Sequence, residues 1–404
     1  MSETILKMRG VCKSFPGVKA LQNVDFDLLR GEVHVLIGEN GSGKSTLMKC
    51  LSGIYPMDEG TIEYLGKPLT IENVNTTINC GISMVHQELA LNDHLTVADN
   101  IFMGHELTNG IFVNRKDMAE RAQQMLSELG AGFQANTLVG DLSIAEKQLV
   151  EIAKALAKNA KLLILDEPTA SLNETDSKAL LDLMLELKKK GMTSIIISHK
   201  LNEISYVADK ITVIRDGSTI ETLVKGKDDI TESRIIKGMV GREIADRFPK
   251  REPKIGEVLM EVKNWTVHHP LYSDRKVVDN VNLNVKKGEV VGISGLMGAG
   301  RTELAMSLFG KSYGSNISGE LYINGKKVQL NTVQEAIKNH LAYVTEDRKG
   351  NGLILSNPIK INTTLANLDA ISRHTVIDKD KEYNVAVDYK NKLNTKCPTV
   401  EQNV

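Results

Sequence analysis

The chain has 404 residues, of which 41% are hydrophobic and 25% charged, an ordinary balance for a globular protein of two or three domains. Its 50 Lys and Arg residues are matched by 51 Asp and Glu residues, and aromatic residues make up only 4%. A nucleic-acid-binding protein is therefore not expected, because the chain has neither a general excess of positive charge nor many rings for base stacking. No apolar run approaches the roughly 18 residues that span a bilayer, so we expect any membrane contact to go through a partner.

An apolar segment at 32–37, EVHVLI, predicts a buried strand that leads directly into a glycine-rich loop. Residues 38–45 fit the pattern G-x-x-x-x-G-K-[ST], and a helix-like segment follows. Glycines let successive backbone N–H groups point at phosphate oxygens, and the helix N-terminus favours negative charge. We therefore predict a nucleotide phosphate loop in which Lys44 neutralises the β- and γ-phosphates and Ser45 ligates Mg²⁺. The predicted nucleotide-binding residues of this loop are Gly38, Glu39, Asn40, Gly41, Ser42, Gly43, Lys44, Ser45 and Thr46.

Three further apolar runs, at 162–165, 194–198 and 211–214, alternate with helical segments and predict a parallel α/β sheet. Asp166 and Glu167 follow the first of these runs, at the carboxyl end of a strand, where open α/β sheets bind ligands. We expect Asp166 to hold Mg²⁺ through water and Glu167 to be the general base that orients the attacking water. His199 follows the next run and is suited to contact a γ-phosphate.

The segment 172–191 predicts a helix that Asn173 caps and Gly191 ends. Residues 241–258 are charged, contain two prolines and predict a linker. The sequence on its two sides repeats: residues 277–310 resemble 21–53, with Gly288 matching Gly31 and Arg301 matching Lys44. We therefore expect one domain at 4–240 and a second copy at 259–404, the second being incomplete and ending before the equivalents of residues 142–167.

Taken in order, five segments resemble the ATP-binding-cassette ATPases: the phosphate loop, VHQEL (85–89), LSIAEKQLVEIAKAL (142–156), LLILDEPTASL (162–172) and IIISHK (195–200). KSFPGVKAL (13–21), GLMGAGRTEL (295–304) and VTEDRKGNGL (344–353) are similar to the twin-cassette ATPase subunits of bacterial monosaccharide importers, and the likeness covers essentially the whole chain. The resemblance implies α/β P-loop domains in tandem that bind ATP and Mg²⁺. It also implies a peripheral subunit on the cytoplasmic face of the inner membrane, beneath a permease that a periplasmic sugar-binding protein supplies with ribose, galactose or xylose.

The resemblance further implies roles for single residues. Phe15, expected in the loop ahead of the first strand, stacks on adenine, and Tyr272 matches it in the second copy. Gln87 ligates Mg²⁺ and senses the permease. Ser143 belongs to the signature that contacts the γ-phosphate held by the opposing cassette, since cassettes of this family pair head to tail. The matching residues of the second phosphate loop are Gly298, Gly300, Arg301 and Thr302.

The chain departs from the family pattern at several of these positions. Ile144 and Ala145 stand where the signature has two glycines, Arg301 replaces the loop lysine, and Glu346 replaces the second glutamine. Arg and Lys are not equivalent in a phosphate loop, and a carboxylate adds negative charge beside phosphate. Head-to-tail pairing places all of these changes in one nucleotide site. We therefore expect one hydrolytic site and one site that mainly binds nucleotide.

Two other functional classes use such cassettes. Soluble twin-cassette translation factors act on the ribosome, but they carry a long, charged helical linker and intact signatures in both halves. Cassette-type DNA-repair ATPases carry a coiled-coil or zinc insertion, and the sequence contains neither. The importer subunit is therefore the favoured function, with the translation factor as the alternative.

Overall fold

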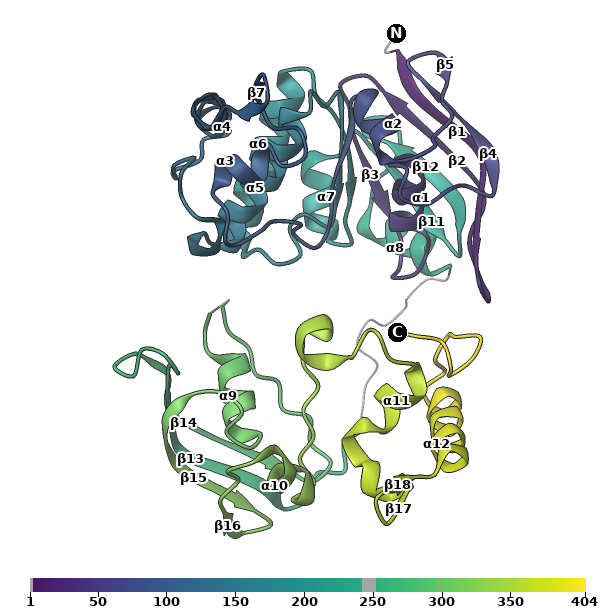
Figure 1. The fold of residues 1–404 in the computed structure, drawn as a ribbon. Coiled ribbons are helices and arrows are strands. Elements are labelled where there is room, and N and C mark those ends of the chain that lie inside the picture. The colour runs from purple at the N-terminus through teal and green to yellow at the C-terminus, as the bar shows by residue number, and fades with distance from the viewer. Residues whose placement is uncertain (1–2, 242–251, 297) are drawn as a thin grey trace. The chain divides into compact units, whose positions relative to one another are not determined.

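In the computed structural model, a six-stranded sheet with strand order β12-β11-β3-β10-β9-β6 forms the centre of the N-terminal part of the chain (Figure 1). All neighbouring strands are parallel except β11 and β12. The strands are β3 (Val33–Ile37), β6 (Ile82–Val85), β9 (Leu162–Asp166), β10 (Thr193–Ile197), β11 (Lys210–Arg215) and β12 (Ser218–Val224). The strands predicted at 32–37, 162–165, 194–198 and 211–214 are thus confirmed.

Each face of this sheet packs into a separate hydrophobic core. Every residue of β3, β9 and β10 is buried, which explains why these strands read as continuous apolar runs rather than as alternating patterns. Along β9, Leu163 and Leu165 join a core with the helices, whereas Leu162 and Ile164 join a second core with an antiparallel sheet.

The antiparallel sheet has the strand order β2-β1-β4-β5. Its strands are β1 (Thr4–Phe15), β2 (Val18–Leu29), β4 (Glu59–Tyr64) and β5 (Lys67–Pro68), and a separate short hairpin is formed by β7 (Thr108–Asn109) and β8 (Phe112–Val113). The helices are α1 (Lys44–Leu51), α2 (Val74–Asn79), α3 (Val97–Ile101), α4 (Arg115–Glu128), α5 (Ile144–Ala157), α6 (Glu174–Lys189), α7 (Leu201–Val207) and α8 (Glu232–Val240), with a 3₁₀ turn at Val139–Asp141.

Helix α6 begins and ends where the sequence predicts. The side chain of Asn173 accepts a hydrogen bond from the backbone N–H of Asp176, and Gly191, just beyond the helix, has a φ of 90°. Asparagine caps orphan N–H groups of the first turn, and glycine tolerates the left-handed conformation that ends many helices.

The structure describes residues 3–241, 252–296 and 298–404, and the chain divides into two units, Met1–Arg247 and Phe248–Val404. Most of the linker predicted at 241–258 lies outside the described residues. Among the described residues, no helix is long and apolar enough to cross a membrane.

The second unit opens with another antiparallel sheet, of strand order β14-β13-β15-β16. Its core surrounds Trp265, whose indole N–H donates to the Ser307 hydroxyl at 3.0 Å. The elements are β13 (Val258–His268), β14 (Lys276–Lys286), α9 (Arg301–Leu308), β15 (Ser315–Ile323), β16 (Lys326–Val328), α10 (Val333–Lys338), a π-helical turn at Arg348–Gly352, α11 (Ile359–Thr364), a 3₁₀ segment at Leu365–Ile371, β17 (Ser372–Arg373), β18 (Val376–Ile377) and α12 (Lys379–Lys392).

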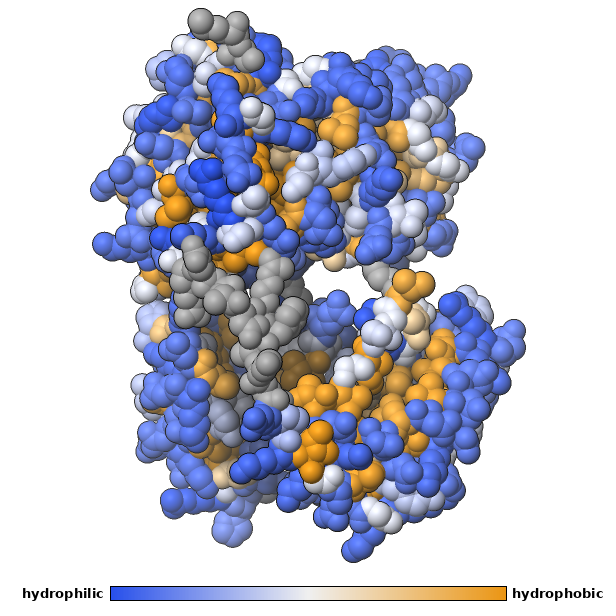
Figure 2. All heavy atoms as spheres, turned by 180° about the vertical axis from the view of Figure 1, so that it is seen from behind, coloured by the Kyte–Doolittle hydropathy of each residue, from blue (hydrophilic) through white to orange (hydrophobic). Residues whose placement is uncertain are grey.

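The second copy differs from the first at the place of the central sheet. Residues 289–296 match β3 and its loop in sequence, and residues 341–344 match β6, yet neither segment forms a strand. Val290 is 78% exposed and Val344 92% exposed, and apolar side chains gather on the surface of this unit (Figure 2). A strand needs neighbours for its backbone hydrogen bonds, and no equivalents of β9, β10 and β11 lie beside these segments among the described residues. Among the described residues, the segments that match β3 and β6 are therefore left without a parallel sheet.

Candidate nucleotide site

The glycine-rich loop connects β3 to α1, and its backbone requires glycine. Gly41 and Gly43 have φ values of 80° and 105°, in the left-handed region that other residues rarely adopt. A Cβ on Gly43 would lie 2.6 Å from the carbonyl oxygen of Ala20, and a Cβ on Gly38 would lie 2.1 Å from that of Ile214. The loop therefore packs its backbone tightly against the sheet while α1 begins at Lys44 with its free N–H groups beside the loop.

Lys44 is held inside this loop rather than extended into solvent. Its side chain is only 5% exposed, and Nζ donates to the carbonyl oxygens of Gly38 at 2.8 Å and Glu39 at 2.9 Å. Burial lowers the pKa of the ammonium, and the negative charges of Glu167 and Asp166 oppose that effect. The hydroxyl of Ser42 is buried without a hydrogen-bond partner among the described residues. An ammonium and an unpaired buried donor in one loop suit the oxygens of a phosphate group.

Asp166 ends β9 and faces the first turn of α1. The Ser45 hydroxyl donates to its Oδ1 at 3.2 Å, and Asp166 is only 4% exposed. Burial raises the pKa of the Asp166 carboxyl, and the neighbouring charge of Glu167 raises it further. A carboxylate and a hydroxyl at this distance from each other are oxygen ligands of the kind that Mg²⁺ prefers.

Glu167 directly follows strand β9, and its carboxylate contacts the side chains of two other predicted residues, His199 and Gln87. Its backbone has a φ of 48°, an unusual value for a residue with a side chain, and its N–H donates to the carbonyl oxygen of Ile197 at 3.0 Å. Its Oε1 lies 3.2 Å from Nδ1 of His199, and its Oε2 accepts from the Gln87 side-chain amide at 3.1 Å. The three residues predicted to be catalytic are thus brought together beside the phosphate loop, although they lie on three separate segments of the chain.

The aromatic residue predicted to stack on adenine requires one correction. Phe15 does not lie in a loop but is the last residue of β1, where it pairs with Val18 across a tight turn. Its ring packs edge-on against Tyr55, with 5.2 Å between ring centroids. The sequence KSFPGVK looks like a loop because of Pro16 and Gly17, but these two residues alone form the turn. Tyr272 of the second unit does lie in a loop, is 61% exposed and packs against His269.

Ser143 caps helix α5, and the structure adds a residue that the sequence analysis missed. The Glu146 carboxylate accepts hydrogen bonds from the Ser143 backbone N–H and from its hydroxyl, both at 2.8 Å, and the Glu146 N–H donates back to the hydroxyl at 3.3 Å. This arrangement is a capping box, whose S-x-x-E spacing could have been found in the sequence. Both donors of Ser143 are therefore already bound to a negatively charged side chain.

Two glycines of the second phosphate loop have backbone angles like those of the first loop, but the surroundings of the loop differ. Gly298 and Gly300 have φ values of 76° and 83°, close to those of the matching Gly41 and Gly43. Its helix, α9, begins at Arg301, as α1 begins at Lys44. The remaining predicted residues, Arg301, Thr302 and Glu346, are all exposed.

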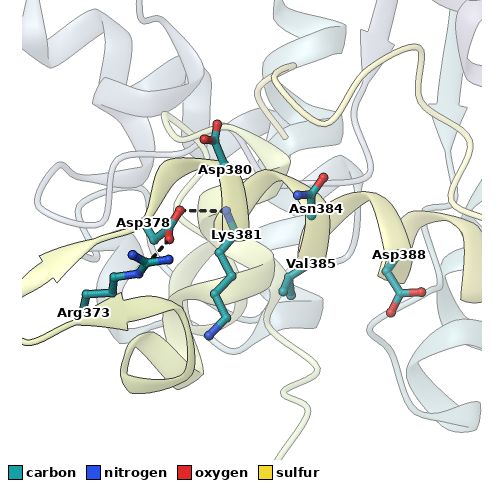
Figure 3. A pocket seen from close by; sticks show the side chains of 7 residues that line it. All are labelled: Arg373, Asp378, Asp380, Lys381, Asn384, Val385 and Asp388. Carbon is teal, nitrogen blue, oxygen red and sulfur yellow. Dashed lines mark hydrogen bonds and ion pairs between the residues drawn. The ribbon is translucent and has the colours of Figure 1, made fainter.

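Hollows in the described part of the chain, including the following two, lie away from the predicted nucleotide residues. One, of about 200 Å³, lies beside Gln87 in the sequence and is lined by apolar residues such as Ile54 and Met84 together with His86, Glu151 and Lys154. The other, of about 540 Å³, lies along α12 and the β17–β18 hairpin and is lined by Arg373, Asp378, Asp380, Lys381, Asn384, Val385 and Asp388. Figure 3 shows that Arg373 and Asp378 pair with each other while the carboxylates of Asp380 and Asp388 lie well apart. This second hollow therefore has no convergent set of functional groups.

The parallel sheet, its glycine-rich loop and the adjoining acidic pair define a P-loop nucleoside triphosphatase of the ATP-binding-cassette type. Solved structures share this fold. The ADP conformation of an ATP-binding cassette of an ABC transporter is 28% identical with a TM-score of 0.54, covering 60% of this chain and 100% of that one. A nucleotide-free cassette from an ABC transporter is 27% identical with a TM-score of 0.53, covering 62% of this chain and 100% of that one.

The sequence comparisons identify the family. The ABC transporter family model matches residues 21–170 and 278–394, more than half of the chain. The chain is 55% identical to the L-arabinose transport ATP-binding protein AraG of Geobacillus stearothermophilus, over 100% of this chain and 79% of that protein. It is 46% identical to the xylose import ATP-binding protein XylG of Thermoanaerobacter pseudethanolicus, over 100% and 80%, and 42% identical to the ribose import ATP-binding protein RbsA of Clostridium perfringens, over 98% and 78%. The chain belongs to the ABC transporter family, as one of its ATP-binding subunits.

Proposed function

We infer that this chain is the ATP-hydrolysing subunit of a bacterial ABC importer, coupling the binding and hydrolysis of ATP to the uptake of a monosaccharide. The names of the similar proteins point to sugar import and not to the ribosomal alternative, and all three sugars in those names are pentoses. L-Arabinose is therefore the first sugar to test. The structural observation that carries the catalytic part of the proposal is the meeting of Glu167, His199 and Gln87 beside the phosphate loop.

The loop residues 38–46 are proposed to bind the nucleotide phosphates. The backbone N–H groups of the loop and of the first turn of α1 face the phosphates, and Lys44 balances the phosphate charge. Phe15 stacks on the adenine ring. Ser45, Asp166 and Gln87 are the proposed Mg²⁺ ligands, and the first two already lie within hydrogen-bond distance of each other. Bound Mg²⁺ supplies positive charge that balances the charge of the β- and γ-phosphates.

Glu167 is proposed to act as the general base. Its carboxylate is proposed to accept a proton from the water that attacks the γ-phosphorus. His199 contacts one carboxylate oxygen and Gln87 donates to the other, which supports this role. The contact of His199 Nδ1 with Oε1 and the hydrogen bond from Gln87 to Oε2 together fix the orientation of the carboxylate. The protein thus supplies orientation and charge rather than a covalent intermediate.

Replacing Glu167 by Gln tests this assignment. The amide keeps the size of the side chain but cannot accept the proton, so we expect ATP binding to persist while the turnover rate of the assembled transporter falls by about 100-fold or more. Steady-state phosphate release and equilibrium ATP binding measure the two quantities. Turnover within a few-fold of the original protein would remove Glu167 from the reaction.

The proposed partners are a membrane permease and, through it, a periplasmic sugar-binding protein. The 200 Å³ hollow close to Gln87 in the sequence combines apolar walls with His86, Glu151 and Lys154, which suits a partly apolar permease segment. Gln87 links the end of that chain segment to Glu167, which supports a role in sensing the permease. We place the chain on the cytoplasmic face of the inner membrane as a peripheral subunit.

The domain organisation is proposed to be a first cassette at 4–240, a linker at 241–258 and a second cassette from 259 onward. The two cassettes are proposed to pair head to tail, so that each nucleotide lies between one phosphate loop and the other cassette's signature. Ser143, with both donors bound by Glu146, then belongs to the site of Arg301, Thr302 and Glu346. The capping box supports a weakened contact of Ser143 with the γ-phosphate in this site, because both of its donors are engaged and the adjacent carboxylate repels a phosphate.

Growth and uptake measurements test the transport function as a whole. Deleting the gene should abolish uptake of radiolabelled L-arabinose or another pentose in the source bacterium, and the tagged protein should co-purify with membranes that contain the permease. Co-purification with ribosomes and unchanged uptake of every pentose would favour the translation factor instead.

A further inference from the structure

Glu203 occupies a position that none of the motifs explains. It lies in the first turn of helix α7, four residues after His199, and its side chain is only 12% exposed. The helix begins after Lys200, whose side chain does not cap it. A nearly buried carboxylate on so short a helix needs partners, and its partners are found on the segments that carry the catalytic residues.

Two buried hydroxyl groups donate to the same oxygen of Glu203. The Thr169 hydroxyl lies 2.6 Å from Oε2, and the Ser198 hydroxyl lies 3.4 Å from it. Thr169 follows Glu167 by two residues, and Ser198 directly precedes His199. Both are buried, at 3% and 4% exposure, so these bonds are shielded from water.

Lys200 completes the contact between the two segments. Its Nζ lies 3.1 Å from Oε1 of Glu203 and donates to the carbonyl oxygen of Thr169 at 2.8 Å. The hydroxyl and the carbonyl of Thr169 are therefore both held by residues that follow His199. The loop after Glu167 cannot shift relative to the end of β10 without breaking these bonds.

The backbone of Glu167 explains why such a restraint is needed. Its φ of 48° is a conformation that persists only where the surrounding structure imposes it. The N–H of Glu167 is held by Ile197, and the network around Thr169 holds the chain on its other side. Together these bonds fix the direction in which the Glu167 carboxylate leaves the strand.

We propose that Glu203 is a positioning residue of the ATPase reaction, holding the loop that carries Glu167 in register with the strand end that carries His199. The inference rests on the proposed roles of these two residues. No hydrogen bond or ion pair joins Glu203 to either residue, so it acts through Thr169 and Ser198. Its loss should therefore slow hydrolysis without weakening ATP binding, which depends on the phosphate loop and Phe15.

The first test compares Glu203→Ala with Glu203→Gln in the transporter assembled with its permease. We expect Glu203→Ala to lower kcat by about 10-fold or more, because small displacements of a catalytic group are costly, and to leave the KM for ATP within about twofold. The amide oxygen of Glu203→Gln still accepts from Thr169 and Ser198, so this variant should recover most of kcat. Glu186→Ala, which removes an exposed carboxylate paired with Lys189 on α6, is the matched control and should leave both constants unchanged.

The second test removes the Thr169 hydroxyl that donates to Glu203. Thr169→Val keeps the shape of the side chain without its hydroxyl, so we expect a fall in kcat, and the double variant with Glu203→Ala should be no slower than the slower single variant. Thr169→Val also carries the test if Glu203→Ala does not fold. Normal kcat in Glu203→Ala or Thr169→Val, or a Glu203→Gln variant as slow as Glu203→Ala, would overturn the inference. Glu167→Gln separates the two proposals: if it remains active, the role of Glu167 itself is wrong.

Discussion

The two phosphate loops show how the surroundings of a single residue decide its chemistry. The backbones of the loops are alike at their paired glycines, but Lys44 is buried with its ammonium on two carbonyl oxygens, whereas Arg301 is exposed. The loop that carries Lys44 follows β3 of the central sheet, whereas the loop that carries Arg301 follows a segment that forms no strand. A loop can hold triphosphate firmly only when the sheet behind it fixes the position of its cation.

Replacing each of these cations by Ala should separate their contributions to nucleotide binding. We expect Lys44→Ala to cost about 2–4 kcal/mol of ATP binding, because several charge-assisted hydrogen bonds are lost, and Arg301→Ala to cost much less. Titration calorimetry with MgATP measures both. Lys116→Ala, on the exposed face of α4, is the control for loss of one positive charge. Equal losses in the two loop variants would contradict the difference between the loops.

Buried histidine makes the stability of the first unit depend on pH. His34 lies in β3 with 1% exposure, its Nε2 2.8 Å from the Thr212 hydroxyl and its Nδ1 3.4 Å from Glu32. Burial lowers the pKa of His34 below its usual 6.5, and the hydrogen bond with Glu32 only partly offsets this. Below about pH 6.5 the unfolded chain binds a proton that the folded chain does not, so stability falls as the pH falls.

We therefore expect the free energy of unfolding to decrease by up to about 1.4 kcal/mol per pH unit below pH 6.5 on account of His34. Urea unfolding at a series of pH values between 5.5 and 7.5 measures the slope. His34→Gln should reduce it, whereas His94→Gln, at an exposed position, should not. Burial also lowers the pKa of His86, so some slope should remain in His34→Gln. An identical slope in the original protein and His34→Gln would show that this histidine does not contribute.

At the scale of single elements, a local pattern is enough to predict where a helix begins and ends, but a strand also needs its neighbours. The cap at Asn173 and the stop at Gly191 were predictable because each acts on its own helix. The segments EVHVLI and EVVGIS have nearly the same local pattern, yet only the first forms a strand, because a strand depends on partners far away in the sequence. The site was predictable where a motif has fixed spacing, as at Lys44 and Glu167. Glu203 has no such motif, since its role depends on Thr169 and Ser198 being adjacent in space.

The helix cap of α6 can be tested by a pair of substitutions. Asn173→Ala removes the acceptor for the Asp176 N–H and should lower the free energy of unfolding by about 1 kcal/mol, whereas Asn173→Asp keeps an acceptor and should cost less. Chemical denaturation of the two variants measures the difference. If both variants lose the same stability, the contact of the Asn173 amide with the Asp176 carboxylate would be the important one, not the cap.

At the scale of the whole molecule, β3 and β6 of the central parallel sheet of the first unit match segments of the second unit that form no strand. The first unit packs its six-stranded sheet between two hydrophobic cores and buries β3, β9 and β10 completely. Among its described residues, the second unit has a core around Trp265 and leaves Val291 and Ile293 exposed at 40% and 54%. The difference lies in long-range pairing, which no inspection of the repeated segments alone reveals.

Hydrogen exchange should report this difference directly. Backbone N–H groups in β3 and β6 are bonded to neighbouring strands or lie within the sheet, so we expect slow exchange there. The matching residues 289–296 and 341–344 form no ladder, and their peptides should exchange faster by about 100-fold or more. Mass spectrometry of deuterated peptides measures both sets in one sample. Similar protection in the two units would show that the second-unit segments are paired in solution.

The exposed aliphatic side chains of the second unit also affect the solubility and self-association of the protein. Val290, Ile293 and Val344 are 78%, 54% and 92% exposed, on a molecule whose formal net charge of only −1 offers little mutual repulsion. Concentrated samples should therefore self-associate through this unit while the first unit is still folded. Light scattering should rise with protein concentration and with added sulfate, and each of these valines exchanged for lysine should improve solubility.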